Sequence, residues 1–87
     1  MIIARAATMF SNGEILEGHD YGNISNLAHK FSYPMDQRIY GFVTSTDEFV
    51  LPKEAMEIAV QAGQTTPLTE LLTPEQLWPT NYLELSY

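Results

Sequence analysis

The apolar positions of the chain form short segments between turn residues, a pattern that predicts β-hairpins alternating with helices. Residues 2–10 are rich in β-branched, aromatic and small apolar residues, which is typical of a strand. Asn12 and Gly13 tolerate the positive φ angles of a tight turn, so residues 14–17 are expected to return as a second strand.

A helix is predicted over residues 21–31, with Asp20 as a suitable N-cap and Asn23 as a second one. We expect it to end before Pro34, because the residue that precedes a proline disfavours the helical region. Four apolar residues have the spacing of one helical face: Ile24, Leu27, Ala28 and Phe31.

A second hairpin is predicted from strands at residues 37–45 and 48–50, on either side of a two-residue turn. The next helix starts at Pro52, since the first helical position needs no N–H donor. It stops at Gly63, which readily adopts a left-handed conformation. Its apolar face is broad: Ala55, Met56, Ile58, Ala59, Val60 and Ala62.

Residues 65–87 are rich in proline and threonine, and we interpret them as an extension of a core formed by residues 1–64. Thr73 and Gln76 have the spacing of a capping box, which predicts one short helical turn. Weak alternation over residues 82–85 would allow an added edge strand.

These segments predict a single two-layer α+β domain. Two β-hairpins join one antiparallel sheet, and both helices cover the same face. The opposite face is then thinly covered, and we expect Tyr40, Phe42 and Phe10 to leave an apolar patch there that favours self-association.

Composition and charge narrow the classes of function. The 87 residues are 45% hydrophobic and 17% charged, which is enough apolar material for one modest core. Short apolar runs and the lack of a signal-peptide pattern favour a cytoplasmic protein without a membrane segment. Eleven acidic residues against four basic ones give a net charge of −7, which disfavours direct nucleic-acid binding and suits a basic protein partner.

The sequence indicates no catalytic residues, no cofactor and no metal. It has no cysteine, no nucleophile motif and no glycine-rich phosphate loop. His19 and His29 are ten residues apart and lack an acidic ligand cluster, so they are not expected to share a metal ion. His19 lies at a strand-to-helix junction, where it suits either a pocket acid–base group or a solvated loop residue.

Ligand-binding residues are the stronger candidates. Gln64 follows the predicted helix end, so its amide can recognise a ligand edge or bond the freed helix carbonyls. Trp78 suits a core position or, if half exposed, a stacking surface. Arg38 can pair with an anionic ligand or with one of the acids. The predicted ligand-binding set is completed by two aromatic walls and a histidine: Tyr40, Phe42 and His19.

Short motifs follow one another in order over residues 4–78: Ala6-Ala7, Asn12-Gly13, Glu17-Gly18-His19, GFVTS at 41–45, Phe49-Val50, Glu54-Ala55, Ile58-Ala59, Ala62-Gly63-Gln64 and TPEQLW at 73–78. On these motifs the chain resembles a family of small, mostly uncharacterised bacteriophage proteins. The resemblance implies a phage-encoded protein of the host bacterial cytoplasm and supplies no activity. Two charged features of the family do not carry over, because Leu51-Pro52-Lys53 replaces an Asp-Arg pair and Gln76 replaces an acidic residue.

The leading hypothesis is a phage counter-defence protein that sequesters a small signalling nucleotide of the host immune system without catalysis. A domain of this size would enclose a ligand at a subunit interface, so a homo-oligomer is expected. The alternatives are an acidic inhibitor of a host defence enzyme that mimics nucleic acid, a small nucleotide-hydrolysing enzyme with His19 as its base, and an accessory replication factor.

Overall fold

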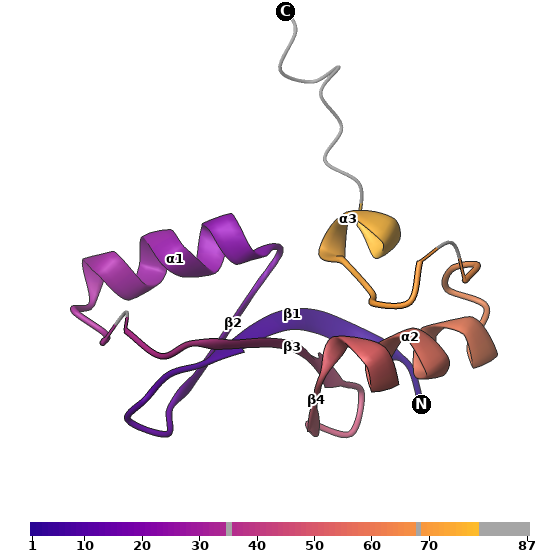
Figure 1. Cartoon of the computed structure of the whole chain (residues 1–87), viewed down its shortest axis with the longest axis horizontal. Coiled ribbons are helices and arrows are strands. Elements are labelled where there is room, and N and C mark those ends of the chain that lie inside the picture. The colour runs from indigo at the N-terminus through magenta and orange to yellow at the C-terminus, as the bar shows by residue number, and fades with distance from the viewer. Residues whose placement is uncertain (35, 68, 79–87) are drawn as a thin grey trace, which may run out of the picture.

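A four-stranded antiparallel sheet forms one layer of the computed structural model, which describes residues 1–34, 36–67 and 69–78 (Figure 1). The strands are β1 (Ile3–Met9), β2 (Ile15–Gly18), β3 (Ile39–Thr44) and β4 (Phe49–Val50), in the spatial order β2-β1-β3-β4. Each hairpin therefore places its longer strand at the centre of the sheet and its shorter strand at an edge. The predicted α+β fold with a sheet of two β-hairpins is confirmed.

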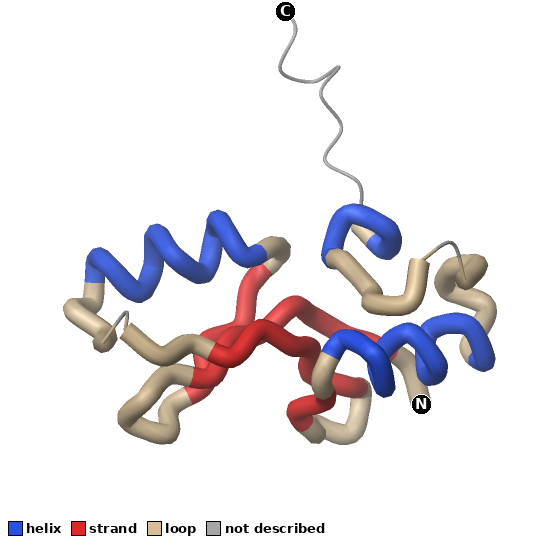
Figure 2. The backbone as a smooth tube through the Cα atoms, viewed as in Figure 1, coloured by secondary structure: helices blue, strands red, loops and turns tan. Residues whose placement is uncertain are grey.

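The helices form the second layer. They are α1 (Tyr21–Lys30), α2 (Pro52–Gln61) and the short α3 (Pro74–Leu77). Figure 2 shows α1 and α3 on the same side of the strands, and buried residues of α1 and α2 join one hydrophobic core. Strands β2 and β3 are both antiparallel to β1 and flank it, so α1 is the crossover between two parallel strands.

The core lies between the helices and one face of the sheet. Ala6 is opposite Phe42 in the β1–β3 ladder, and Phe42 is opposite Val50 in the β3–β4 ladder. Directly opposite residues of an antiparallel ladder point to the same face, so these three side chains share the helix-covered face. The buried core members are Ile3, Ala6, Phe10, Ile24, Ala28, Phe42, Val50, Ala55, Met56, Ala59 and Leu72.

The opposite face of the sheet differs from the predicted one. Phe10 and Phe42 are 3% and 0% exposed within the core, and Tyr40 has the same alternation as Phe42, so the predicted apolar patch of these three residues is wrong. Alternation along a strand divides its residues between two faces but does not tell which face the helices will cover. We call the face opposite the helices the open face, and its positions are Arg5, Ala7, Met9, Ile15, Glu17, Ile39, Gly41, Val43 and Phe49.

Helix α2 is terminated by Gly63, as predicted. Gly63 has a φ angle of 74°, and its N–H donates to the Val60 carbonyl at 3.1 Å. The N–H of Gln64 donates to the Ala59 carbonyl at 2.8 Å. This pair of bonds is a Schellman motif, in which a left-handed residue turns the chain out of the helix.

Helix α1 ends in the same motif, with a serine in the place of the glycine. Ser32 has a φ angle of 59°, and its N–H donates to the His29 carbonyl at 3.3 Å. The Tyr33 N–H donates to the Ala28 carbonyl at 2.9 Å. The helix is thus already terminated at Ser32, before the predicted influence of Pro34.

The segment that leads to α3 packs against α2. Leu72 and Pro74 are buried, and the Leu72 N–H donates to the Pro52 carbonyl at 3.2 Å. The predicted cap of α3 forms through Gln76, whose side-chain oxygen accepts from the Thr73 N–H at 2.9 Å. The edge strand predicted at residues 82–85 lies outside the described residues.

Candidate functional site

Five of the six residues predicted to bind a ligand belong to one row of neighbouring side chains. The ring centroids of His19 and Trp78 are 6.3 Å apart, and those of Trp78 and Phe42 are 6.5 Å apart. These rings come from the β2–α1 junction, from the residue after α3 and from β3. The tertiary fold therefore brings together groups that are far apart in the sequence.

The row continues across the sheet to a cation. Tyr21 lies 6.1 Å from Phe42 and 4.8 Å from Tyr40 between ring centroids. The guanidinium of Arg38 lies 5.6 Å from the Tyr40 ring centroid, in the range of a cation–π contact. We call the complete set the aromatic row: His19, Trp78, Phe42, Tyr21, Tyr40 and Arg38.

Accessibility differs along the aromatic row. Phe42 is fully buried, so it supports the row from the core and offers a ligand no surface. Trp78 is half-buried and His19 is exposed at one end, while Tyr40 is 40% exposed near the other end. A ligand can therefore reach two ends of the row, one with an indole beside an imidazole and one with a phenol beside a guanidinium.

Tyr21 is the member of the row that the sequence prediction missed. Its hydroxyl donates to the Gly41 carbonyl at 2.9 Å. Burial, and then the negative charge of Glu75, raise the pKa of Tyr21, so the hydroxyl stays protonated. A signal was present, because Tyr21 lies three residues before Ile24 and so continues the buried face of α1.

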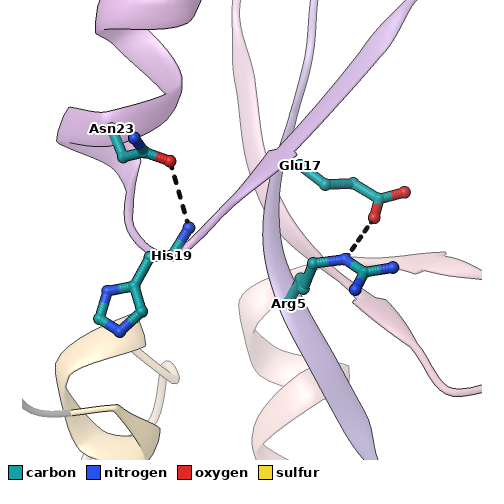
Figure 3. A network of polar contacts seen from close by, with 4 residues as sticks. All are labelled: Arg5, Glu17, His19 and Asn23. Carbon is teal, nitrogen blue, oxygen red and sulfur yellow. Dashed lines mark hydrogen bonds and ion pairs between the residues drawn. The ribbon is translucent and has the colours of Figure 1, made fainter.

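Two capping hydrogen bonds at the N-terminus of α1 hold His19 in place, and Figure 3 shows the one between Asn23 and His19. The Asp20 carboxylate accepts from the Asn23 N–H at 2.8 Å, which confirms Asp20 as the N-cap. The Asn23 side-chain oxygen in turn accepts from the His19 N–H at 3.4 Å. Figure 3 shows the imidazole pointing toward α3, and its Nδ1 lies 3.7 Å from the second Asp20 oxygen.

Gln64, the sixth predicted residue, has a structural role that neither sequence alternative foresaw. Its Oε1 accepts from the Ile3 N–H at 2.8 Å, and its Nε2 donates to the Ile3 carbonyl at 2.9 Å. The amide thus bonds to β1 as a neighbouring strand would, next to the register shift between Ile3 and Arg5. Because β1 occupies these polar atoms, we do not place Gln64 in the binding site.

The described residues offer no metal cluster, and a pocket among them lies away from the aromatic row. Within residues 1–34, 36–67 and 69–78, no group of three or more ligating side chains could hold a metal ion. A pocket of about 400 Å³ in this part of the chain is lined by Met1, Ile2, Ile58, Gln61 and Ala62. Its lining contains no member of the aromatic row, so we do not treat it as the site.

The chain is a small α+β protein with an aromatic row that extends from His19 to Arg38. The family model described as Phage T4 y16D protein matches residues 2–82, so the chain belongs to this family of bacteriophage proteins. The resemblance inferred from the short motifs is thereby confirmed. No curated protein and no solved structure matches the chain. Among the described residues, every helix is too short or too polar to cross a bilayer.

Proposed function

We propose that this phage protein is a counter-defence binding protein that captures a small signalling nucleotide of the host without catalysis. The observation that supports the proposal is the aromatic row, with accessible rings at one end and a cation at the other. Nucleotides combine a planar base, which stacks on aromatic faces, with phosphates that favour arginine.

The surroundings of the row favour one orientation of such a ligand. Asp20 lies next to His19, and Glu75 is close enough to Tyr21 to raise the pKa of its hydroxyl. These carboxylates make the Trp78 end unfavourable for phosphate and leave it suited to a base. A phosphate is better placed at Arg38, whose Nη1 lies 3.5 Å from the Ser25 hydroxyl.

Electrostatics make Arg38 the critical group for an anionic ligand. The chain carries a net charge of −7, so its general field repels a nucleotide. A local guanidinium can offset that repulsion through hydrogen bonds that a distant lysine does not make. Base stacking adds about 1–3 kcal/mol per base to nucleic-acid complexes, which places much of the affinity at Trp78.

The single tryptophan of the chain supplies a direct test, because its fluorescence reports on the row. Linear and cyclic nucleotides should be titrated in turn, with native mass spectrometry of each mixture. We expect one class of nucleotide to quench the fluorescence and to add its own mass. Unchanged fluorescence together with unbound mass across the panel would refute the proposal.

A matched pair of variants assigns the phosphate contact. We expect Arg38→Gln to weaken binding of the phosphorylated ligand about tenfold or more, a loss typical of a charge-assisted hydrogen bond. Lys53 is an exposed residue of α2, so Lys53→Gln removes the same charge from the surface and should leave the affinity within about twofold. Equal losses in both variants would indicate general electrostatics instead of a site at Arg38.

A second function has its own observation. Four acidic side chains are exposed on the β3–β4 turn and on α2: Asp47, Glu48, Glu54 and Glu57. They would suit the basic surface of a host enzyme, as in an acidic inhibitor. Pull-down of a host protein that is lost at high salt and in the Glu54→Gln/Glu57→Gln variant would support this function.

A further inference from the structure

The open face carries an apolar stripe that crosses three strands. Met9 of β1 is opposite both Ile15 of β2 and Ile39 of β3, so the three side chains lie side by side. Ile39 is 49% exposed and Ile15 is 38% exposed. In the next residue pair along the strands, Ala7 is opposite Gly41, and both are buried, because the Phe49 ring lies over Gly41.

The open face is also neutral on an otherwise acidic protein. Its register positions include one acidic and one basic residue, Glu17 and Arg5. The Arg5 Nε lies 2.6 Å from the Glu17 Oε1, and both side chains are exposed to solvent (Figure 3). Two copies with a net charge of −7 would therefore meet the least repulsion on this face.

We propose that the open face is the interface of a homodimer in which two sheets pack face to face. A twofold interface brings the same surface of both copies together, so it requires a self-complementary pattern. Arg5 and Glu17 meet this requirement. A twofold axis that lies between the two sheets and passes midway between these residues places Arg5 opposite the partner's Glu17 and Glu17 opposite the partner's Arg5.

The strand geometry shows that the same axis also matches the apolar groups. Strands are spaced about 4.8 Å apart, and side chains on one face repeat about every 6.8 Å along a strand. With these spacings, the axis places the stripe of Ile15, Met9 and Ile39 over the partner's edge strand β4, where the partner's Phe49 is partly exposed. Burying this stripe supplies the hydrophobic gain that the exposed ion pair alone cannot supply.

The dimer does not depend on the proposed ligand. The aromatic row lies on the helix-covered side of the sheet, and the open face lies on the other side. Both rows of the dimer would remain accessible, so failure of nucleotide binding and failure of dimerisation are separate results.

The first test is subunit number, measured by native mass spectrometry and light scattering over a wide concentration range. We expect a dimer for the wild type and a monomer for Ile39→Glu. The matched control is Leu71→Glu, since Leu71 is 52% exposed but lies in the segment before α3, away from the strands. It should remain dimeric. A wild-type monomer would overturn the proposal and would indicate that the open face binds a different protein. An Ile39→Glu variant that remains dimeric would also overturn it.

The second test separates contacts between copies from the ion pair within one copy. Arg5→Glu gives each open face two negative charges, and Glu17→Arg gives each two positive charges, so each variant alone should be monomeric. An equal mixture should form a heterodimer with the summed mass of the two variants. Thermal unfolding verifies that both are folded, and the lack of a heterodimer in a mixture of folded variants would overturn the proposed pairing.

Discussion

The side-chain amide of Gln64 forms hydrogen bonds of 2.8 and 2.9 Å with the N–H and the carbonyl of Ile3. A residue at the end of α2 therefore completes the pairing of the first strand. The two residues are 61 positions apart in the sequence, so this contact joins the start of β1 to the segment that follows α2. It also explains why an amide at this position favours the fold without contacting a ligand.

Replacing Gln64 by alanine should lower the free energy of unfolding by about 1–3 kcal/mol, because two partly buried polar groups of Ile3 lose their partner. Urea denaturation measures the change. Gln61→Ala removes an exposed amide from the same helix and should change the stability by less than about 0.5 kcal/mol. Equal midpoints for both variants would contradict the structural role of Gln64.

Gln64→Glu should make the stability depend on pH. The protonated carboxyl can donate to the Ile3 carbonyl as the amide does, whereas the ionised carboxylate cannot. The folded-state pKa of the introduced carboxyl is then raised, so its full contribution is present below the unfolded pKa of about 4.3 and is lost as the pH rises through the folded pKa. Thermal unfolding at several pH values, with the wild type as the reference, tests the direction. A variant that loses stability on acidification, relative to the wild type, would oppose it.

Tyr21→Phe should lower the stability at neutral pH and weaken its dependence on pH at high pH. At neutral pH the variant loses the hydrogen bond to the Gly41 carbonyl, which should cost about 0.5–1.5 kcal/mol. Burial raises the folded-state pKa of Tyr21, so the wild type loses stability as the pH rises above the unfolded value of about 10. The variant should lose less over that interval. Parallel pH profiles for the two proteins would show that the Tyr21 hydroxyl does not titrate as expected.

The two Schellman motifs predict a reciprocal pair of substitutions. Ser32→Gly should raise the free energy of unfolding by about 0.5–1 kcal/mol, because glycine adopts the φ angle of 59° without a steric penalty. Gly63→Ser places a side chain at a φ angle of 74° and should lower stability by about 1 kcal/mol. No heavy atom beyond its own neighbours lies within 4 Å of a Cβ added at Gly63, so the effect reports on the backbone alone. Changes of the same sign in both variants would refute this account.

Two buried threonines should respond differently to replacement by valine. The Thr8 hydroxyl has no hydrogen-bond partner among the described residues, whereas the Thr44 hydroxyl oxygen accepts from the N–H groups of Thr46 and Glu48 at 3.2 Å each. Both residues are 1% exposed. We expect Thr8→Val to raise stability by about 1 kcal/mol and Thr44→Val to lower it by about 1–2 kcal/mol in urea denaturation. A Thr8→Val variant less stable than the wild type would contradict this prediction, because it would indicate that the Thr8 hydroxyl stabilises the fold.

The local signals of the sequence predicted the elements of the fold well. Gly63, Asp20 and the Gln76 cap each act within a few residues of their own position, and each is found in its predicted role. The prediction was wrong where the outcome depends on distant contacts. The face of β3 that carries Phe42 is chosen by the helices that pack on it, and a period of two residues cannot reveal that choice.

The candidate site shows the same limit. Tyr40, Phe42, Trp78 and His19 were selected from the sequence for their chemistry, but their common row results from three segments that the fold places together. Tyr21 was missed because it directly follows the N-cap Asp20, so the sequence indicated a role at the start of the helix and not a role in a binding site. The bonds of Gln64 to Ile3 had no local signal at all.

The position of Trp78 has a consequence for the mechanics of the molecule. The segment from residue 69 to residue 78 is joined to α2 by the bond between the Leu72 N–H and the Pro52 carbonyl, and its last residue forms one wall of the row. A molecule that stacks on Trp78 would bind only when this segment is packed against α2, so binding would stabilise the packed state. Occupancy would then protect this stretch from proteases, in proportion to ligand concentration.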